Sequence, residues 1–243
     1  MKTGLTSITF RKLTAEQVIE VAKQANLTGI EWGGDIHARP DDLENCKRVG
    51  ELTRAAGLEV LSYGCYYFVG KGSDFNQFSL AAEALGCKVI RIWMPWDDYD
   101  YTHHKEEIDR ISEIASSRGQ TVAFEFHMKT VNDHAPVSKA MLDYFGKDNV
   151  KTYWQPPYWP QNPVDTDADL KALAPYVQHL HVYKWVGPDN DRRPLEEGAK
   201  EWANYISIFK NCNAAILEFV RDDNVELFLK DAETLQRLVK ENA

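Results

Sequence analysis

The feature that most constrains the fold of this chain is an alternation that occurs eight times along its length. Each unit has a short apolar segment typical of a strand, a polar or glycine-containing turn, and an amphipathic helical pattern. The predicted strands span residues 4–10, 29–32, 59–64, 89–94, 122–127, 150–155, 177–183 and 215–220. Because such alternation favours a parallel sheet covered by helices, and eight units can close on themselves, we expect an α/β fold: a single-domain (β/α)8 barrel over residues 1–243.

Helix signals between these strands agree with that prediction. Thr14 is a plausible N-cap and Gly57 a plausible C-cap. The predicted helices span residues 14–24, 42–56, 74–85, 105–118, 136–145, 167–173, 201–210 and 225–241. An open, doubly wound sheet is the alternative, but it usually carries a glycine-rich nucleotide loop after its first strand, and residues 6–11 read TSITFR. The closed barrel is therefore favoured.

Composition restricts the possible partners. A formal charge of -9 opposes a nucleic-acid surface, which needs clustered Lys and Arg, so we expect no nucleic-acid partner and a small polar substrate instead. No apolar run approaches the length of a signal peptide or a membrane span, so we expect a cytoplasmic protein with no membrane contact. The four cysteines are scattered without CxxC spacing and are expected to be buried free thiols.

Side-chain alternation within the later strands brings polar residues to the barrel axis. In residues 122–127, Glu125 and His127 share the face opposite the large apolar side chains. The same rule directs His181 and Glu218 inwards and Phe219 outwards. Because these positions fall at strand ends, we expect Glu125, His181 and Glu218 to converge at the C-terminal mouth, where such barrels carry their active sites.

Two carboxylates and an imidazole are a suitable ligand set for one divalent metal ion, with positions left open for substrate oxygens. Gln155, at the end of the sixth strand, can add a neutral carbonyl oxygen. The alternative is a buried hydrogen-bonded network without metal, in which one of the two carboxyl groups has to stay protonated. We favour the metal, and Mn2+, Mg2+ and Zn2+ all remain possible.

Other polar residues fall near the same end of the barrel. Glu31 and Arg91 both face inwards by alternation and are expected to form a buried ion pair beneath the site, with a structural role. His37, on the loop after the second strand, and His127 are predicted to contact substrate.

These residues resemble a known family, the xylose isomerase-like TIM barrels, over essentially the whole chain. The matching segments are AFEFH with Glu125, HLHVYKW with His181, the loop RRPLEEG before Trp202, and AILEFV with Glu218. The resemblance implies that a Glu, an Asp, a His and a Glu bind one metal ion and that the two Glu flank the substrate. Glu125, His181 and Glu218 match this set. The sixth strand departs from it, since Gln155 replaces the Asp and Tyr158 stands where a His follows in the epimerases.

The resemblance implies a divalent-metal-dependent isomerase or epimerase acting on a small sugar, keto-acid or polyol derivative. In that chemistry the metal holds a carbonyl and the adjacent hydroxyl, and it stabilises an enediolate. One of Glu125 and Glu218 removes the proton α to the carbonyl, and the other returns a proton. Further expected substrate contacts are Tyr158, Lys184 and Arg193.

Three alternatives stay open. A lyase or dehydratase would use the same metal and a similar intermediate. A non-catalytic sugar-binding barrel would explain the loss of the Asp. An endonuclease of this superfamily is disfavoured, because the chain is acidic and lacks the density of His and Asp that a multi-zinc site needs. A homodimer is possible, although no segment specifies an interface.

Overall fold

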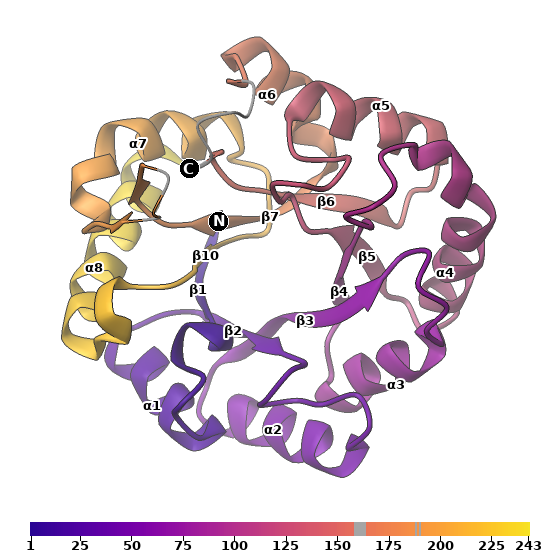
Figure 1. The fold of residues 1–243 in the computed structure, drawn as a ribbon. Helices are drawn as coiled ribbons and strands as arrows, with labels where there is room; N and C mark the ends of the chain where they lie inside the picture. The colour runs from indigo at the N-terminus through magenta and orange to yellow at the C-terminus, as the bar shows by residue number, and fades with distance from the viewer. Residues whose placement is uncertain (158–163, 188, 190) are drawn as a thin grey trace.

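The computed structural model describes residues 1–157, 164–187, 189 and 191–243. Its main feature is a closed barrel of parallel strands in the order β1-β10-β7-β6-β5-β4-β3-β2 (Figure 1). The barrel strands are β1 (Lys2–Thr6), β2 (Gly29–Gly33), β3 (Glu59–Phe68), β4 (Val89–Trp93), β5 (Thr121–Phe124), β6 (Val150–Trp154), β7 (Val177–Val182) and β10 (Ala214–Leu217). The predicted single-domain (β/α)8 barrel is confirmed.

Helices surround the barrel on all sides (Figure 1). They are α1 (Ala15–Gln24), α2 (Leu43–Ala55), α3 (Phe75–Leu85), α4 (Lys105–Ser117), α5 (Ala135–Phe145), α6 (Asp167–Leu173), α7 (Ala199–Ile208) and α8 (Val225–Asn242). Helix α1 begins with a capping box in which Thr14 and Gln17 satisfy each other's backbone N–H groups. The apolar faces of the helices pack on the outward side chains of the strands, and this layer forms the main hydrophobic core.

Several predicted strands end earlier than expected. The first strand stops at Thr6, and Ser7–Phe10 form a 3-10 helix. Strands β5 and β10 end at Phe124 and Leu217, so the residues that follow them begin the loops. Strand β3 is longer than predicted and continues to Phe68, which pairs with Trp93 of β4. A small antiparallel hairpin, β8 (Trp185–Val186) with β9 (Asp191–Arg192), was not predicted.

The lower end of the barrel interior is narrow and mostly apolar. Leu61, Ala214 and Ile216 form one cluster there. A Cβ atom at Gly29 would lie 2.3 Å from the backbone oxygen of Glu59, so only glycine allows these strands to approach so closely. This end is therefore filled by backbone, aliphatic side chains and the buried imidazole of His179.

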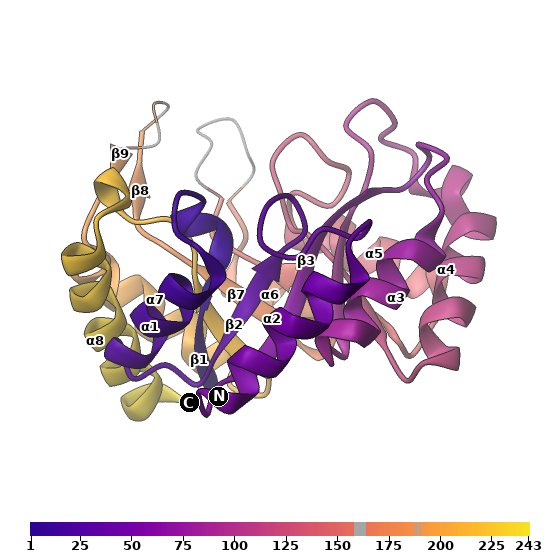
Figure 2. The ribbon, with the colours of Figure 1, turned by 90° about the horizontal axis from the view of Figure 1, so that it is seen from below.

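The two ends of the barrel differ in their loops. In the side view, the long loops and the β8–β9 hairpin project from one end, and both chain termini lie near the other (Figure 2). The projecting loops follow the C-terminal ends of the strands. Among the described residues no helix has the length and hydropathy to cross a membrane. The four cysteines are buried free thiols, as expected.

Candidate metal centre and active site

Three polar side chains from three different strands meet at the C-terminal end of the barrel. Glu125 follows β5 directly, His181 lies in β7, and Glu218 follows β10. All three are buried, and one donor atom from each lies within 4.8 Å of the others. The structure therefore brings together the three residues that alternation directed to the axis.

The imidazole of His181 is held by carboxylates at both ring nitrogens. Its Nδ1 lies 3.2 Å from Oε1 of Glu125 and 3.4 Å from Oε2 of Glu218. Its Nε2 lies 3.2 Å from Oε1 of Glu31. Glu31 thus fixes the orientation of the ring from below and leaves Nδ1 facing the other two carboxylates. A carboxylate behind a histidine is the usual support for a metal-binding imidazole.

Glu31 is the most heavily bonded carboxylate of this cluster. Its Oε2 accepts hydrogen bonds from Ser62 Oγ at 2.7 Å and from Tyr153 Oη at 2.8 Å. Its Oε1 faces His181 and also Arg91, whose Nε lies 3.1 Å away. The side chain is fully buried. Since all of its lone pairs face donors, Glu31 anchors the cluster and is not available to a substrate.

Arg91 connects the lower and upper carboxylates. Besides its contact with Glu31, its Nη1 donates to Oε2 of Glu125. The predicted Glu31–Arg91 pair is present, and its extension to Glu125 was not predicted. A Cβ atom at position 64 would lie 2.5 Å from Nη2 of Arg91, so Gly64 leaves room for the guanidinium. Oε1 of Glu125 remains directed to His181 and the cavity.

The pKa values of the cluster shift in opposite directions. Burial alone would raise the pKa of Glu125, but the charges of Arg91 and His181 lower it. Burial raises the pKa of Glu218, and the nearby Glu125 carboxylate adds to this. Burial would lower the pKa of His181, but Glu218, Glu125 and Glu31 raise it well above its usual value. The two carboxylates and the imidazole are therefore electrostatically coupled, with the pKa of Glu125 lowered and that of Glu218 raised.

Gln155 follows β6 and lines the same cavity as Glu125 and Glu218. It is buried, and its Oε1 has no hydrogen-bond partner among the described residues. A buried amide oxygen without a partner costs free energy unless a ligand or ion satisfies it. Oε1 of Glu125, Nδ1 of His181 and a Glu218 oxygen form a donor set that fits a hard or borderline divalent cation, and Gln155 borders the same cavity.

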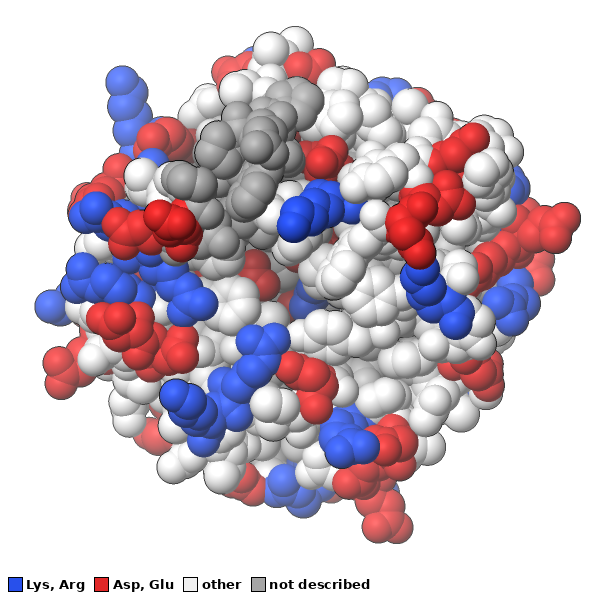
Figure 3. Space-filling model, in the orientation of Figure 1, with Lys and Arg blue, Asp and Glu red and all other residues white. Residues whose placement is uncertain are grey.

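A cavity of about 280 Å³ opens directly above this cluster. It is lined by six charged or polar residues from five segments of the chain, namely Arg11, Arg91, Glu125, His127, Gln155 and Glu218. Figure 3 looks onto this end of the molecule and shows a hollow near its centre, with side chains of both charges spread around the outer edge. The cavity gives a small molecule access to both glutamates.

His127 and Arg11 both line this cavity. His127 packs its ring against Trp93, with 4.8 Å between centroids, and its Nδ1 lies 2.8 Å from the backbone oxygen of Met128. Arg11 follows the first 3-10 helix and was not predicted. It is held by Asp35, at 2.7 Å, and by Tyr66, at 2.9 Å. Its loop position has no periodicity from which its direction could be inferred.

His37, predicted to contact substrate, does not line the cavity. Its Nε2 lies 2.9 Å from the backbone oxygen of Leu13, and its Nδ1 lies 3.0 Å from Oγ of Ser7. Nε2 must carry a proton to bond a carbonyl, so Nδ1 accepts from Ser7. The buried ring therefore joins the loops after β1 and β2.

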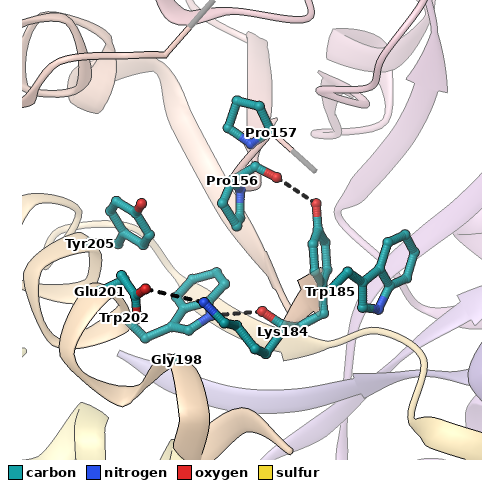
Figure 4. Close-up of a pocket in the computed structure, with 9 residues that line it drawn as sticks. Pro156, Pro157, Lys184, Trp185, Gly198, Glu201, Trp202 and Tyr205 are labelled. Carbon is teal, nitrogen blue, oxygen red and sulfur yellow. Dashed lines mark hydrogen bonds and ion pairs between the residues drawn. The ribbon is translucent and has the colours of Figure 1, made fainter. Parts of the chain in front are cut away.

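Lys184 lines a neighbouring pocket of about 160 Å³. Its Nζ lies 3.1 Å from Oε1 of Glu201, while Tyr183 donates to the backbone oxygen of Pro156 (Figure 4). Trp185 borders both this pocket and the central cavity. Lys184 is thus separated from the glutamate cluster by an aromatic wall.

Arg193 and Tyr158 complete the predicted substrate contacts. Arg193 pairs with Asp191 at 2.6 Å and lines a different depression, beside Pro194 and Asp231. Its direction follows from the β8–β9 hairpin, which has no clear signal in the sequence. Tyr158 lies outside the described residues.

Phe219 was predicted to face outwards, and this is wrong. It lies beyond β10 with a left-handed backbone, φ 54°, which ends the alternation. Its N–H donates to Oγ1 of Thr9 at 3.0 Å. Its ring lines the cavity and lies 4.7 Å from the guanidinium carbon of Arg192. The backbone reversal therefore places an aromatic ring beside Glu218 at the mouth.

The closed parallel barrel and the buried polar cluster at its C-terminal mouth define a (β/α)8 barrel with a candidate enzyme site. The family model described as xylose isomerase-like TIM barrel matches residues 19–238. The chain therefore belongs to the xylose isomerase-like TIM barrel family, as the resemblance in its sequence predicted. A comparison with curated protein sequences gave no match.

Similar solved structures extend over the whole chain. The probable 3-DHS dehydratase AsbF from Bacillus anthracis shares 19% identity, covers 97% of this chain and 99% of its own, and has a TM-score of 0.80. The 3-keto-D-glucoside 4-epimerase YcjR from E. coli shares 13% identity, with coverage of 98% and 99% and a TM-score of 0.74. The IOLI protein with a bound zinc atom shares 14%, with coverage of 100% and 99% and a TM-score of 0.76. At these identities the likeness concerns the fold.

Proposed function

We propose that this protein is a divalent-metal-dependent isomerase or epimerase of a small sugar or related carbonyl compound, acting through an enediolate. The observation that carries the proposal is the set of donor atoms from Glu125, His181 and Glu218 within 4.8 Å of one another, directly below a cavity. The unpartnered oxygen of Gln155 adds a fourth donor. The dehydratase, epimerase and zinc-bound structures with the same fold agree with this class of chemistry.

Each residue of the cluster has a defined task in this proposal. The bound ion would supply Lewis-acid polarisation of a substrate carbonyl. Glu125, whose pKa is lowered, is the carboxylate that removes a proton next to that carbonyl. Glu218, the second carboxylate beside the cavity, is the group that returns a proton. Glu31 and Arg91 hold His181 and Glu125 in place from below.

Metal binding is the first test. Calorimetry with Mn2+, Mg2+ and Zn2+ on the wild-type protein should show one site, weakened at least about tenfold in Glu218→Gln, because a charged ligand is lost. Glu201→Gln is the matched control, since Glu201 is half exposed and lies outside the cluster. Absence of binding for all three ions in the wild type would overturn the metal assignment.

Proton abstraction is the second test. The Mn2+-loaded protein is incubated in D2O with a panel of ketoses, aldoses and keto-acids, and deuterium at the carbon next to the carbonyl is measured by mass spectrometry. Exchange should fall by about 100-fold or more in Glu125→Gln, since general-base steps contribute about 10²–10⁴-fold. Product analysis separates isomerisation from loss of water, which begins with the same abstraction. Exchange unchanged by Glu125→Gln would contradict the assigned role.

A further inference from the structure

The cavity is polar at its floor and mainly aromatic along its walls. Its floor contains the carboxylates of Glu125 and Glu218 and the amide of Gln155, all buried. Its walls are aromatic. Phe68, Trp93 and Trp96 form one side, with Phe68 and Trp93 stacked at 5.7 Å between ring centroids. Trp185 and Phe219 form another wall, with 5.8 Å between their centroids.

Trp96 is the most unusual member of these walls. It is 54% exposed, yet it borders the cavity. Its ring stands edge-on to Phe68 and Trp93, with interplanar angles of 83° and 81°. These edge contacts fix the indole and leave apolar surface open to solvent at the mouth. Such surface in a ligand cavity favours contact with a flat apolar group.

The charges around the cavity argue against a phosphorylated substrate. Among the described lining residues the arginines are Arg11 and Arg91. Arg11 is paired with Asp35, and Arg91 is paired with Glu31 and Glu125. Lys184 and Arg193, which could have bound a phosphate, line other pockets and have carboxylate partners of their own. The charges of these four side chains are therefore already neutralised by carboxylates.

We propose that the outer half of the cavity is a second subsite, for an uncharged ring joined to the reacting unit, and that Trp96 is its principal wall. The substrate class is then a neutral two-ring compound, with the ring that bears the reacting carbonyl on the carboxylate floor and the second ring against the indole. The inference rests on the proposed function only in assigning the reacting unit to that floor.

Matched pairs of glycosides test the subsite. The binding of phenyl and methyl β-D-glucosides, and of the corresponding galactosides, is measured by calorimetry on the full chain with and without Mn2+. A phenyl glycoside should bind about five- to tenfold more tightly than its methyl partner, as expected for one aromatic contact. Glucose 6-phosphate should bind no better than glucose.

Two exposed residues of one loop provide the variant and its control. Trp96→Ala should remove the preference for the phenyl glycoside. Tyr99→Ala should keep it, since Tyr99 is 59% exposed and does not line the cavity. Equal binding of phenyl and methyl glycosides, no detectable binding of any of them, tighter binding of the phosphate, or an unchanged preference in Trp96→Ala would each overturn the subsite. Because the preference is also measured without metal, its failure is distinguishable from a failure of Mn2+ to bind.

Discussion

The polar side chains on the floor of the cavity and those at its rim differ in the partners that hold them. On the floor, polar side chains meet partners from distant strands, as when Glu31 of β2 contacts Arg91 of β4 and His181 of β7. At the rim, charged side chains of the loops pair with one another in partly exposed positions, such as Arg11 with Asp35 and Arg193 with Asp191. The floor geometry is therefore a property of the barrel strands, whereas each rim contact depends on the paths of the loops.

The largest effect should come from removing the cation at the centre of the floor. Arg91→Met leaves Glu31 and Glu125 buried without their guanidinium and should lower the free energy of unfolding by about 3–5 kcal/mol, measured by urea denaturation. Arg193→Met, at the exposed rim, should change it by about 1 kcal/mol or less. Equal losses in both variants would remove the distinction between floor and rim.

Metal affinity should depend strongly on pH. An ion at Nδ1 of His181 must displace a proton, and the pKa of this imidazole is raised by Glu218, Glu125 and Glu31 against the effect of burial. Mn2+ affinity should therefore rise with pH, by about tenfold per unit for each proton released. Calorimetry in buffers of different ionisation enthalpy measures that release.

For the metal-free protein, stability should instead fall as the pH rises. A raised folded-state pKa means that the His181 contribution to stability is complete below the unfolded value of about 6.5 and is lost as pH rises through the folded value. Saturating Mn2+ should offset this loss at high pH. An affinity independent of pH would show that His181 is not a ligand.

His37 gives an intermediate effect and a second comparison. His37→Ala removes two buried hydrogen bonds between the loops after β1 and β2, and should cost about 2 kcal/mol of stability in thermal or urea unfolding. Mn2+ affinity should be unchanged, because the ring does not line the cavity. A loss of metal binding without a loss of stability would instead favour the functional role first predicted for it.

Gln155→Asp should produce the smallest of these changes, and it should strengthen metal binding instead of weakening the protein. A third carboxylate near the ion should tighten Mn2+ binding by about tenfold, equivalent to about 1.4 kcal/mol. Gln155→Ala, which removes the oxygen, should weaken binding. If Gln155→Ala binds Mn2+ as well as the wild type does, the amide is not a ligand.

The sequence predicted the floor better than the rim for a physical reason. Inside a strand and at the first residue after it, side-chain alternation still fixes direction, and this placed His181, Glu125 and Glu218 correctly at the axis. Beyond that residue, backbone dihedral angles decide, and the positive φ of Phe219 reverses its expected direction. The hairpin that directs Arg193 has two strands of two residues each, too short to show periodicity. Arg11 also lies in a loop, so side-chain alternation does not predict its direction either.

The hydrogen bond from Phe219 to Thr9 joins the segment after the last strand to the segment after the first. Strands β10 and β1 are also neighbours, so Glu218 lies at the seam where the cylinder closes. Its partners His181 and Glu125 come from β7 and β5, in the same half of the cylinder, whereas Glu31 and Arg91, which hold them in place, come from β2 and β4 in the other half. Joining the two halves therefore brings the proposed metal-binding side chains against the side chains that orient them, and complementation of two half-barrel fragments should raise Mn2+ affinity.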